Sequence, residues 1–177
     1  MINNLSKVYK KNKYRFLLIL ALFVVLIIAM GLFKKIKSKS EMAKYDSEIL
    51  IIKGNGDQLD SLTLKELRDM GGEKLDVRIN NGLDTVPVEG ISIDQIIGKL
   101  DYNLKDSGVM VIEDDDGNSK RVPMADVLEP GREYLVYKLD GKPIFDINPA
   151  YGKLMMIDTA SDSSENWIRN VKTLDIK

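Results

Sequence analysis

The chain has 177 residues, of which 44% are hydrophobic and 30% charged, a composition typical of a folded protein. Cysteine and histidine are both absent, which excludes disulfides, thiolate nucleophiles, Cys or His zinc sites, Ser-His-Asp triads and His-ligated haem. Residues 1–45 carry ten Lys and Arg against Glu41, a charge of +9, and residues 46–177 carry 16 basic and 26 acidic residues, a charge of −10. Because nucleic-acid phosphates repel an acidic domain, we expect no nucleic acid partner.

Residues 16–33, FLLILALFVVLIIAMGLF, contain no charge and no proline. As a helix these 18 residues would span roughly 27 Å, close to the hydrocarbon thickness of a bilayer. They predict an uncleaved transmembrane helix in contact with membrane lipid. A cleaved signal peptide is the main alternative, although residues 31–35 (GLFKK) make a poor cleavage site. A buried core helix is a weaker alternative, because the segment is apolar on every face.

The charges beside this segment predict its orientation. Five basic residues precede it and four follow it within residues 34–39, which favours a cytoplasmic N-terminus and a domain outside the cell membrane. The predicted organisation is a basic cytoplasmic tail (1–15), a single-pass anchor (16–33), a juxtamembrane linker (34–46) and an extracytoplasmic domain (47–177).

Two short helices are predicted in the first half of the domain, each with a capping box at its start. Thr63 and Glu66 form the first box, and Ser92 and Gln95 form the second. Apolar pairs at the positions of a hydrophobic staple flank the boxes: Leu62 with Leu67, and Ile91 with Ile96. We expect the first helix to end at Gly71-Gly72 and the second near Leu100.

Strands are predicted around these helices, at residues 48–53, 74–80, 109–112, 120–122, 134–139, 153–157 and 167–176. Asp116-Gly117 predicts a β-hairpin turn, and Asp140-Gly141 ends a later strand. The order is mainly β with two or three inserted helices. The predicted fold class is therefore α+β with a mixed sheet, not a regular βαβ alternation.

The order of these motifs resembles the molybdopterin-binding domain of the sulfite oxidase family, in a short form that covers residues 47–177. The resemblance is carried by LTLKEL (62–67), VEGISIDQII (88–97), the Asp-Gly pair at 116–117, YLVYKLDGKPI (134–144), GKLMMI (152–157) and WIRNV (167–171). It implies a sulfite-oxidase-like fold, an oxidoreductase-like origin and a pterin as the candidate cofactor.

The enzymes of that family hold molybdenum through a cysteine thiolate after an early strand, shortly before a Gly-Asn or similar pair. The matching stretch here is VRINNG (77–82), where Arg78, or Val77 with a shift of one residue, takes the cysteine position. Neither side chain supplies a soft anionic ligand. By family position Arg78, Asn80 and Asn81 are the candidate cofactor-binding residues, and the equal alternative is that they are exposed strand-end and turn residues. No catalytic or metal-binding residue is predicted.

Two acidic segments and the single tryptophan have competing interpretations. Residues 158–165, DTASDSSE, would not attract an anionic pterin phosphate or sulfite. Residues 113–118, EDDDGN, suggest calcium but lack the spacing and distal glutamate of an EF-hand loop, so a solvated hairpin turn is preferred. Trp167 opens an alternating strand, which favours core packing over a ligand platform.

Together these patterns predict a membrane-anchored, molybdopterin-binding-like domain that acts as a non-catalytic binding or accessory module of the cell envelope, a pseudoenzyme. The residues themselves require no cofactor, and the resemblance adds a pterin without protein-ligated molybdenum. The expected partners are membrane lipid through residues 16–33, an envelope protein and this small molecule. Two alternatives stay open: a divergent oxidoreductase that binds the molybdenum cofactor without a protein thiolate, and a structural subunit of a membrane complex.

Overall fold

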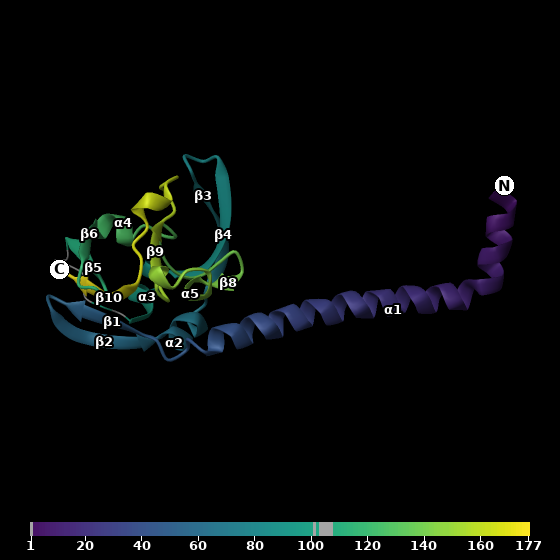
Figure 1. The fold of residues 1–177 in the computed structure, drawn as a ribbon, viewed down its shortest axis with the longest axis horizontal. Coiled ribbons are helices and arrows are strands. Elements are labelled where there is room, and N and C mark those ends of the chain that lie inside the picture. Colours follow the sequence, from purple (N-terminus) through teal and green to yellow (C-terminus); the bar gives the residue numbers. More distant parts are fainter. Residues whose placement is uncertain (1, 101, 103–107) are drawn as a thin grey trace. The chain divides into compact units, whose positions relative to one another are not determined.

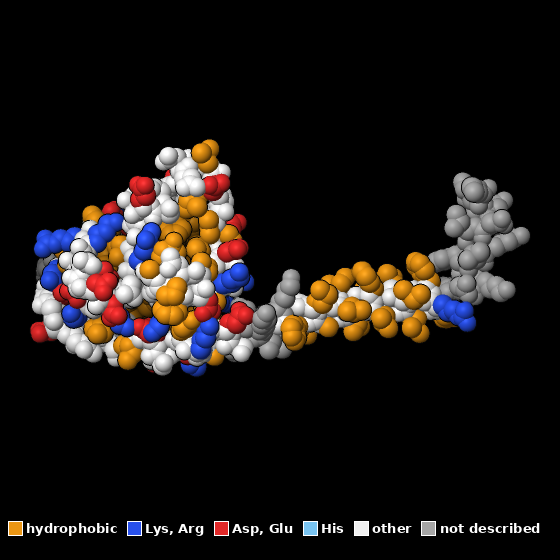
Figure 2. Space-filling view, viewed as in Figure 1, with side chains coloured by type: hydrophobic (Ala, Val, Ile, Leu, Met, Phe, Trp, Pro, Cys, Tyr) orange, Lys and Arg blue, Asp and Glu red, His pale blue; other side chains and the backbone are white. Residues whose placement is uncertain are grey.

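The computed structural model describes residues 2–100, 102 and 108–177, and the side chains of residues 14–33, 40–100, 102 and 108–177. The chain forms two compact units, Met1–Ser40 and Glu41–Lys177. Helix α1 (Ile2–Ala43) makes up the first unit and supplies the first residues of the second. Within it Tyr14–Phe33 is long and apolar enough to cross a membrane and is not buried, as Figure 2 shows. A signal sequence meets the same criteria of length and composition.

The second unit is α+β, as predicted, and contains two five-stranded sheets (Figure 1). Sheet A has the spatial order β2 (Asp57–Thr63), β1 (Ile49–Gly54), β10 (Val171–Ile176), β5 (Val109–Asp114) and β6 (Ser119–Pro123). Strands β1 and β10 are parallel and the other pairs are antiparallel, so sheet A is mixed.

Sheet B is antiparallel and is centred on β7. Its strands are β3 (Glu73–Ile79), β4 (Asp84–Ser92), β7 (Glu133–Leu139), β8 (Lys142–Pro143) and β9 (Met155–Asp158). Strand β7 pairs with β4 on one side, and with β8 and β9 at different points on the other. The described helices of this unit are α2 (Leu64–Asp69), α3 (Ile93–Leu100), α4 (Met124–Val127), α5 (Ile144–Ile147) and the 3₁₀ turns η1 (Pro149–Tyr151) and η2 (Ser164–Asn166).

The main core contains side chains from both sheets, including Leu50 and Leu174 from sheet A and Leu135 and Met156 from sheet B. A second cluster covers the other face of sheet B and includes Val136 of β7. Successive residues of a strand point to opposite faces, so β7 is buried on both sides. This alternation places Leu135 and Tyr137, and by the same alternation Glu133, on the face that packs toward sheet A.

The predicted helices are both present, but only the first has its capping box. The Glu66 amide donates to Thr63 Oγ1 over 3.2 Å, and the Thr63 amide donates to Glu66 Oε2 over 2.8 Å. No corresponding hydrogen bond joins Ser92 and Gln95 among the described residues, so the second box was wrong. The reason is that β4 runs directly into α3, and Ser92 is still a strand residue opposite Tyr134.

The predicted strands are present, with three additions and two that begin later than expected. Strands β2, β4 and β8 were not predicted, the strand expected at 153–157 begins at Met155, and the strand expected at 167–176 begins only at Val171. Residues 164–166 form the turn η2, and Asn170 has a left-handed backbone with φ of 52°. Between these two features Ile168 forms an isolated antiparallel bridge with Met156, so the expected strand is interrupted at Asn170.

Residues 41–46 contribute to the second unit, within the segment predicted as a linker. Met42 is only 1% exposed and belongs to the main core. The Tyr45 hydroxyl donates to Asp146 Oδ1 over 2.6 Å, and Arg68 forms an ion pair with Asp46.

Candidate functional site

The three candidate cofactor-binding residues lie together at the exposed end of the β3–β4 hairpin. Asn80 and Asn81 have left-handed backbones, with φ of 52° and 56°, and Asn80 Nδ2 donates to Asp84. The Asn81 amide donates to the Asp162 carbonyl oxygen over 3.0 Å, and Arg78 Nε lies 3.1 Å from Asp162 Oδ1. These contacts form the turn and attach the hairpin to the loop between β9 and η2.

Neither residue at the family's cysteine position fits a molybdenum ligand. Val77 is 2% exposed and packs in the second cluster, and the Arg78 side chain is directed to Asp162. An isopropyl group has no donor atom, and a guanidinium is cationic. With no cysteine anywhere in the chain, the residues do not fit a cofactor that requires a protein thiolate.

The acidic segment 113–118 is the turn of the β5–β6 hairpin. Asp114 Oδ1 accepts from the amides of Asp116, over 3.0 Å, and Asn118, over 2.8 Å. The side-chain hydrogen bond from Asn118 lowers the pKa of Asp114 below its ordinary value. The Asp114 carboxylate therefore stabilises the turn, which agrees with the preferred interpretation of this segment as a hairpin turn.

One pocket lined by described residues of the second unit, of about 480 Å³, lies over β3, β4 and the β7–β8 turn. Its lining includes Glu89, whose carboxylate oxygens each lie 3.1 Å from the buried Lys138 ammonium. The buried charge beside this pocket is therefore already neutralised.

A smaller pocket, about 230 Å³, lies between β6 at the edge of sheet A and β9 at the edge of sheet B. We call it the edge pocket. Its lining residues are Lys120, Arg121, Val122, Pro123, Asp126, Glu133, Met156, Asp158, Asn166 and Ile168. Apolar walls and three carboxylates therefore meet in one small space.

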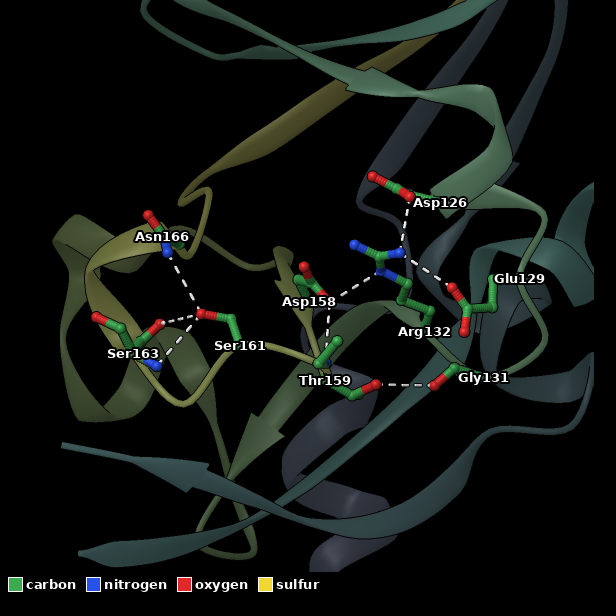
Figure 3. A network of polar contacts seen from close by, with 10 residues as sticks. Asp126, Glu129, Gly131, Arg132, Asp158, Thr159, Ser161, Ser163 and Asn166 are labelled. Atoms are coloured by element: carbon green, nitrogen blue, oxygen red, sulfur yellow. Dashed lines mark hydrogen bonds and ion pairs between the residues drawn. The ribbon is translucent and has the colours of Figure 1, made fainter. Parts of the chain in front are cut away.

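Arg132 neutralises two of these three carboxylates (Figure 3). Its Nη1 lies 2.7 Å from Asp126 Oδ1 and 3.0 Å from Glu129 Oε2, and its Nε lies 3.4 Å from Asp158 Oδ1. Nearby, the Thr159 hydroxyl donates to the Gly131 carbonyl oxygen over 3.0 Å and holds the loop after β9 against the start of β7. Arg132 thus forms ion pairs with three carboxylates.

The third carboxylate, Glu133, has no such partner. Its side chain is on the core face of β7 with Leu135, it is 4% exposed, and no described residue gives it a hydrogen bond or ion pair. Burial, reinforced by the negative charge of Asp158, raises the pKa of Glu133 to about 7. A carboxyl group of this kind in a pocket is a candidate functional residue.

Glu133 is not among the functional residues that the sequence motifs predicted. One feature could have identified it: an acid begins the otherwise apolar run of β7, two residues before Leu135 and four before Tyr137. Alternation places all three on one face, so a buried acid could be inferred. The charges around it come from α4 and β9, whose placement the sequence does not reveal.

No family model and no curated protein sequence matches the chain. Among solved structures, 27 chains are similar. One is the sulfane dehydrogenase SoxCD from Paracoccus pantotrophus, with a TM-score of 0.58 and 14% sequence identity, over 75% of this chain and 38% of that one. The likeness shows a shared sulfite-oxidase-like fold, and the chain covers less than half of that structure's length.

Proposed function

We propose that this protein is a membrane-anchored, non-catalytic binding or accessory module of the cell envelope, built on a sulfite-oxidase-like fold. Residues 16–33 anchor it in the bilayer, residues 1–15 lie in the cytoplasm, and the domain lies outside. An envelope protein or a small molecule is its partner.

One observation carries the proposal: the position that the family resemblance gives to the molybdenum ligand holds no thiolate. Val77 is part of a packed core and Arg78 is bound to Asp162, so neither is free to ligate a metal. A soft anionic donor cannot be replaced by either side chain. The fold is retained while its redox ligand is missing, which supports binding without catalysis.

The test is a cofactor analysis of the full chain, purified in mild detergent from a host that makes the molybdenum cofactor. The protein is denatured, the supernatant is examined for pterins by mass spectrometry and fluorescence, and molybdenum is counted in parallel. We expect less than stoichiometric molybdenum. A pterin without metal would identify the ligand of the binding module, whereas stoichiometric molybdenum with pterin would overturn the proposal in favour of a divergent oxidoreductase.

A matched pair of variants sharpens this test. Val77→Cys and Arg78→Cys each restore a thiol at the family position, one in the core and one at the surface. If either variant gains molybdenum while the unaltered chain has none, the missing thiolate is the cause of the missing metal.

Orientation is tested separately with protease added to intact cells. We expect the domain to be digested while the tail (1–15) stays protected. A protected domain would place it in the cytoplasm and overturn the extracytoplasmic location.

A further inference from the structure

The edge pocket contains the buried carboxyl group of Glu133, to which no described residue gives a hydrogen bond or ion pair. Arg132 is committed to Asp126, Glu129 and Asp158. Glu133 and Asp158 stand opposite each other in the β7–β9 register, so two carboxylates share one end of the space between the sheets. Like charges in directly opposite positions destabilise a sheet pair. A cation in the pocket would relieve this repulsion.

The other charged groups around Glu133 come from the elements that surround the edge pocket. From β6 come Lys120, whose Nζ donates to the Asn166 carbonyl oxygen over 2.9 Å, and Arg121, which is exposed. Asp126 comes from α4 and Asp158 from β9. Glu129 and Arg132 come from the turn between α4 and β7. The pocket therefore has a buried acid inside and cations on its β6 side.

The size and walls of the pocket indicate the kind of cation. No group of three or more acids among the described residues is placed to hold a metal ion. Val122, Pro123, Met156 and Ile168 provide apolar walls, which suit a carbon chain. A volume of about 230 Å³ is below the range of pockets for drug-sized ligands, so the ligand is small.

We propose that the edge pocket binds a small zwitterionic amine, an amino-acid-like molecule whose ammonium group pairs with Glu133 and whose carboxylate faces Lys120. Its carbon chain lies along Val122 and Met156. The inference deepens the proposed binding role, on which it rests, by naming the ligand class.

The experiment is a calorimetric titration of the full chain in mild detergent with glycine, 4-aminobutyrate and 6-aminohexanoate. These probes keep both charges and vary their separation. Butyrate, which lacks the amine, and butylamine, which lacks the carboxylate, are the control ligands. We expect at least one zwitterion to bind, butylamine to bind more weakly and butyrate not to bind.

Variants assign the binding to the pocket. Glu133→Gln keeps the shape of the side chain and removes its charge, and should abolish zwitterion binding. Glu165→Gln, at an exposed acid outside the pocket lining, should leave binding unchanged, and Lys120→Gln should reduce zwitterion affinity to that of butylamine. Thermal unfolding of each variant shows that it is folded.

The pH dependence gives a second readout. Binding requires ionised Glu133, whose pKa is about 7, while the ligand's ammonium stays charged. Affinity should therefore rise about tenfold from pH 6 to pH 8 in the unaltered chain. The proposal is overturned if no zwitterion binds, if butyrate binds as well as the zwitterions, or if Glu133→Gln binds as the unaltered chain does. Molybdenum content tests the binding role independently, so the two failures are distinguishable.

Discussion

Glu133 and Asp158 lie directly opposite each other where β7 pairs with β9, on the face of sheet B that packs toward sheet A. Arg132 contacts Asp158 but not Glu133, so one member of the pair is compensated and the other is not. Folding brings these two acids together and takes Glu133 out of water. The pair therefore links the stability of the domain to pH.

Replacing Glu133 with Gln should stabilise the domain at high pH only. Folding raises the pKa of Glu133 from 4.5 to about 7, so the folded domain holds the proton of this carboxyl more tightly than the unfolded chain does. The resulting contribution to the free energy of unfolding is fully present below pH 4.5 and is lost as the pH rises through about 7. The variant should match the unaltered chain at pH 4 and exceed it at pH 8 by up to about 3 kcal/mol in free energy of unfolding. Urea unfolding followed by the fluorescence of Trp167 measures this, and an equal difference at both pH values would contradict it.

Gly90→Ala should destabilise the domain by about 1–3 kcal/mol. A Cβ at this position would lie 2.4 Å from the Leu135 carbonyl oxygen and 2.9 Å from the Val136 Cα, and both atoms belong to the backbone of β7. Gly98→Ala is the matched control, since the added Cβ in helix α3 has no atom within 4 Å beyond its chain neighbours and its own helix backbone. There alanine should stabilise by roughly 1 kcal/mol, because it has the higher helix propensity. Equal effects in urea unfolding would contradict the close β4–β7 contact.

Thr63→Ala and Ser92→Ala should differ, although the sequence around both suggests a capping box. Thr63→Ala removes the hydrogen bond from the Glu66 amide and should cost about 1 kcal/mol. Ser92→Ala removes no capping hydrogen bond and should cause no loss. A comparable loss of stability in both variants would show that Ser92 does cap helix α3.

The Arg78–Asp162 ion pair should contribute less than about 1 kcal/mol, because the Arg78 side chain is 64% exposed. A double-mutant cycle with Arg78→Ala, Asp162→Ala and the combined variant measures this contribution in unfolding experiments. A coupling free energy of zero would show that the ion pair does not attach the hairpin to the loop.

Met42→Ala should destabilise the domain by about 2–5 kcal/mol, because the side chain is buried in the main core. Met30, which is 59% exposed in the apolar segment, provides the control. Met30→Ala should leave domain unfolding unchanged. If Met42→Ala also has no effect, residues 41–46 are a linker and not part of the folded domain.

The sequence predicted elements whose pattern is local and missed those that depend on tertiary pairing. Residues 49–54 are strongly apolar and read as a strand, whereas β2 is a polar edge strand that follows it in a hairpin. Strand β4 contains Pro87 and Gly90, which weaken the strand pattern. The box at Ser92 failed because strand pairing extends to that residue.

The candidate site was harder to predict than the fold. The residues at the family's cofactor position could be located, since β3 and its turn follow from alternation and an Asn-Asn-Gly sequence. The burial of Glu133 could be inferred from alternation, but its acidic neighbour could not, because Asp158 is 25 residues further along the chain and lies opposite Glu133 only through β7–β9 pairing.

Strand β10 occupies the centre of sheet A, between β1 and β5. Its partner β1 is synthesised early and pairs with it in parallel. Ile51 therefore cannot pair until Thr173 has been synthesised. Such long-range pairing is slow and leaves strand edges exposed in the meantime. During translation, therefore, β1 and β5 each have an unpaired edge until β10 is made. We expect chaperones and proteases to bind a nascent chain that stalls before Val171.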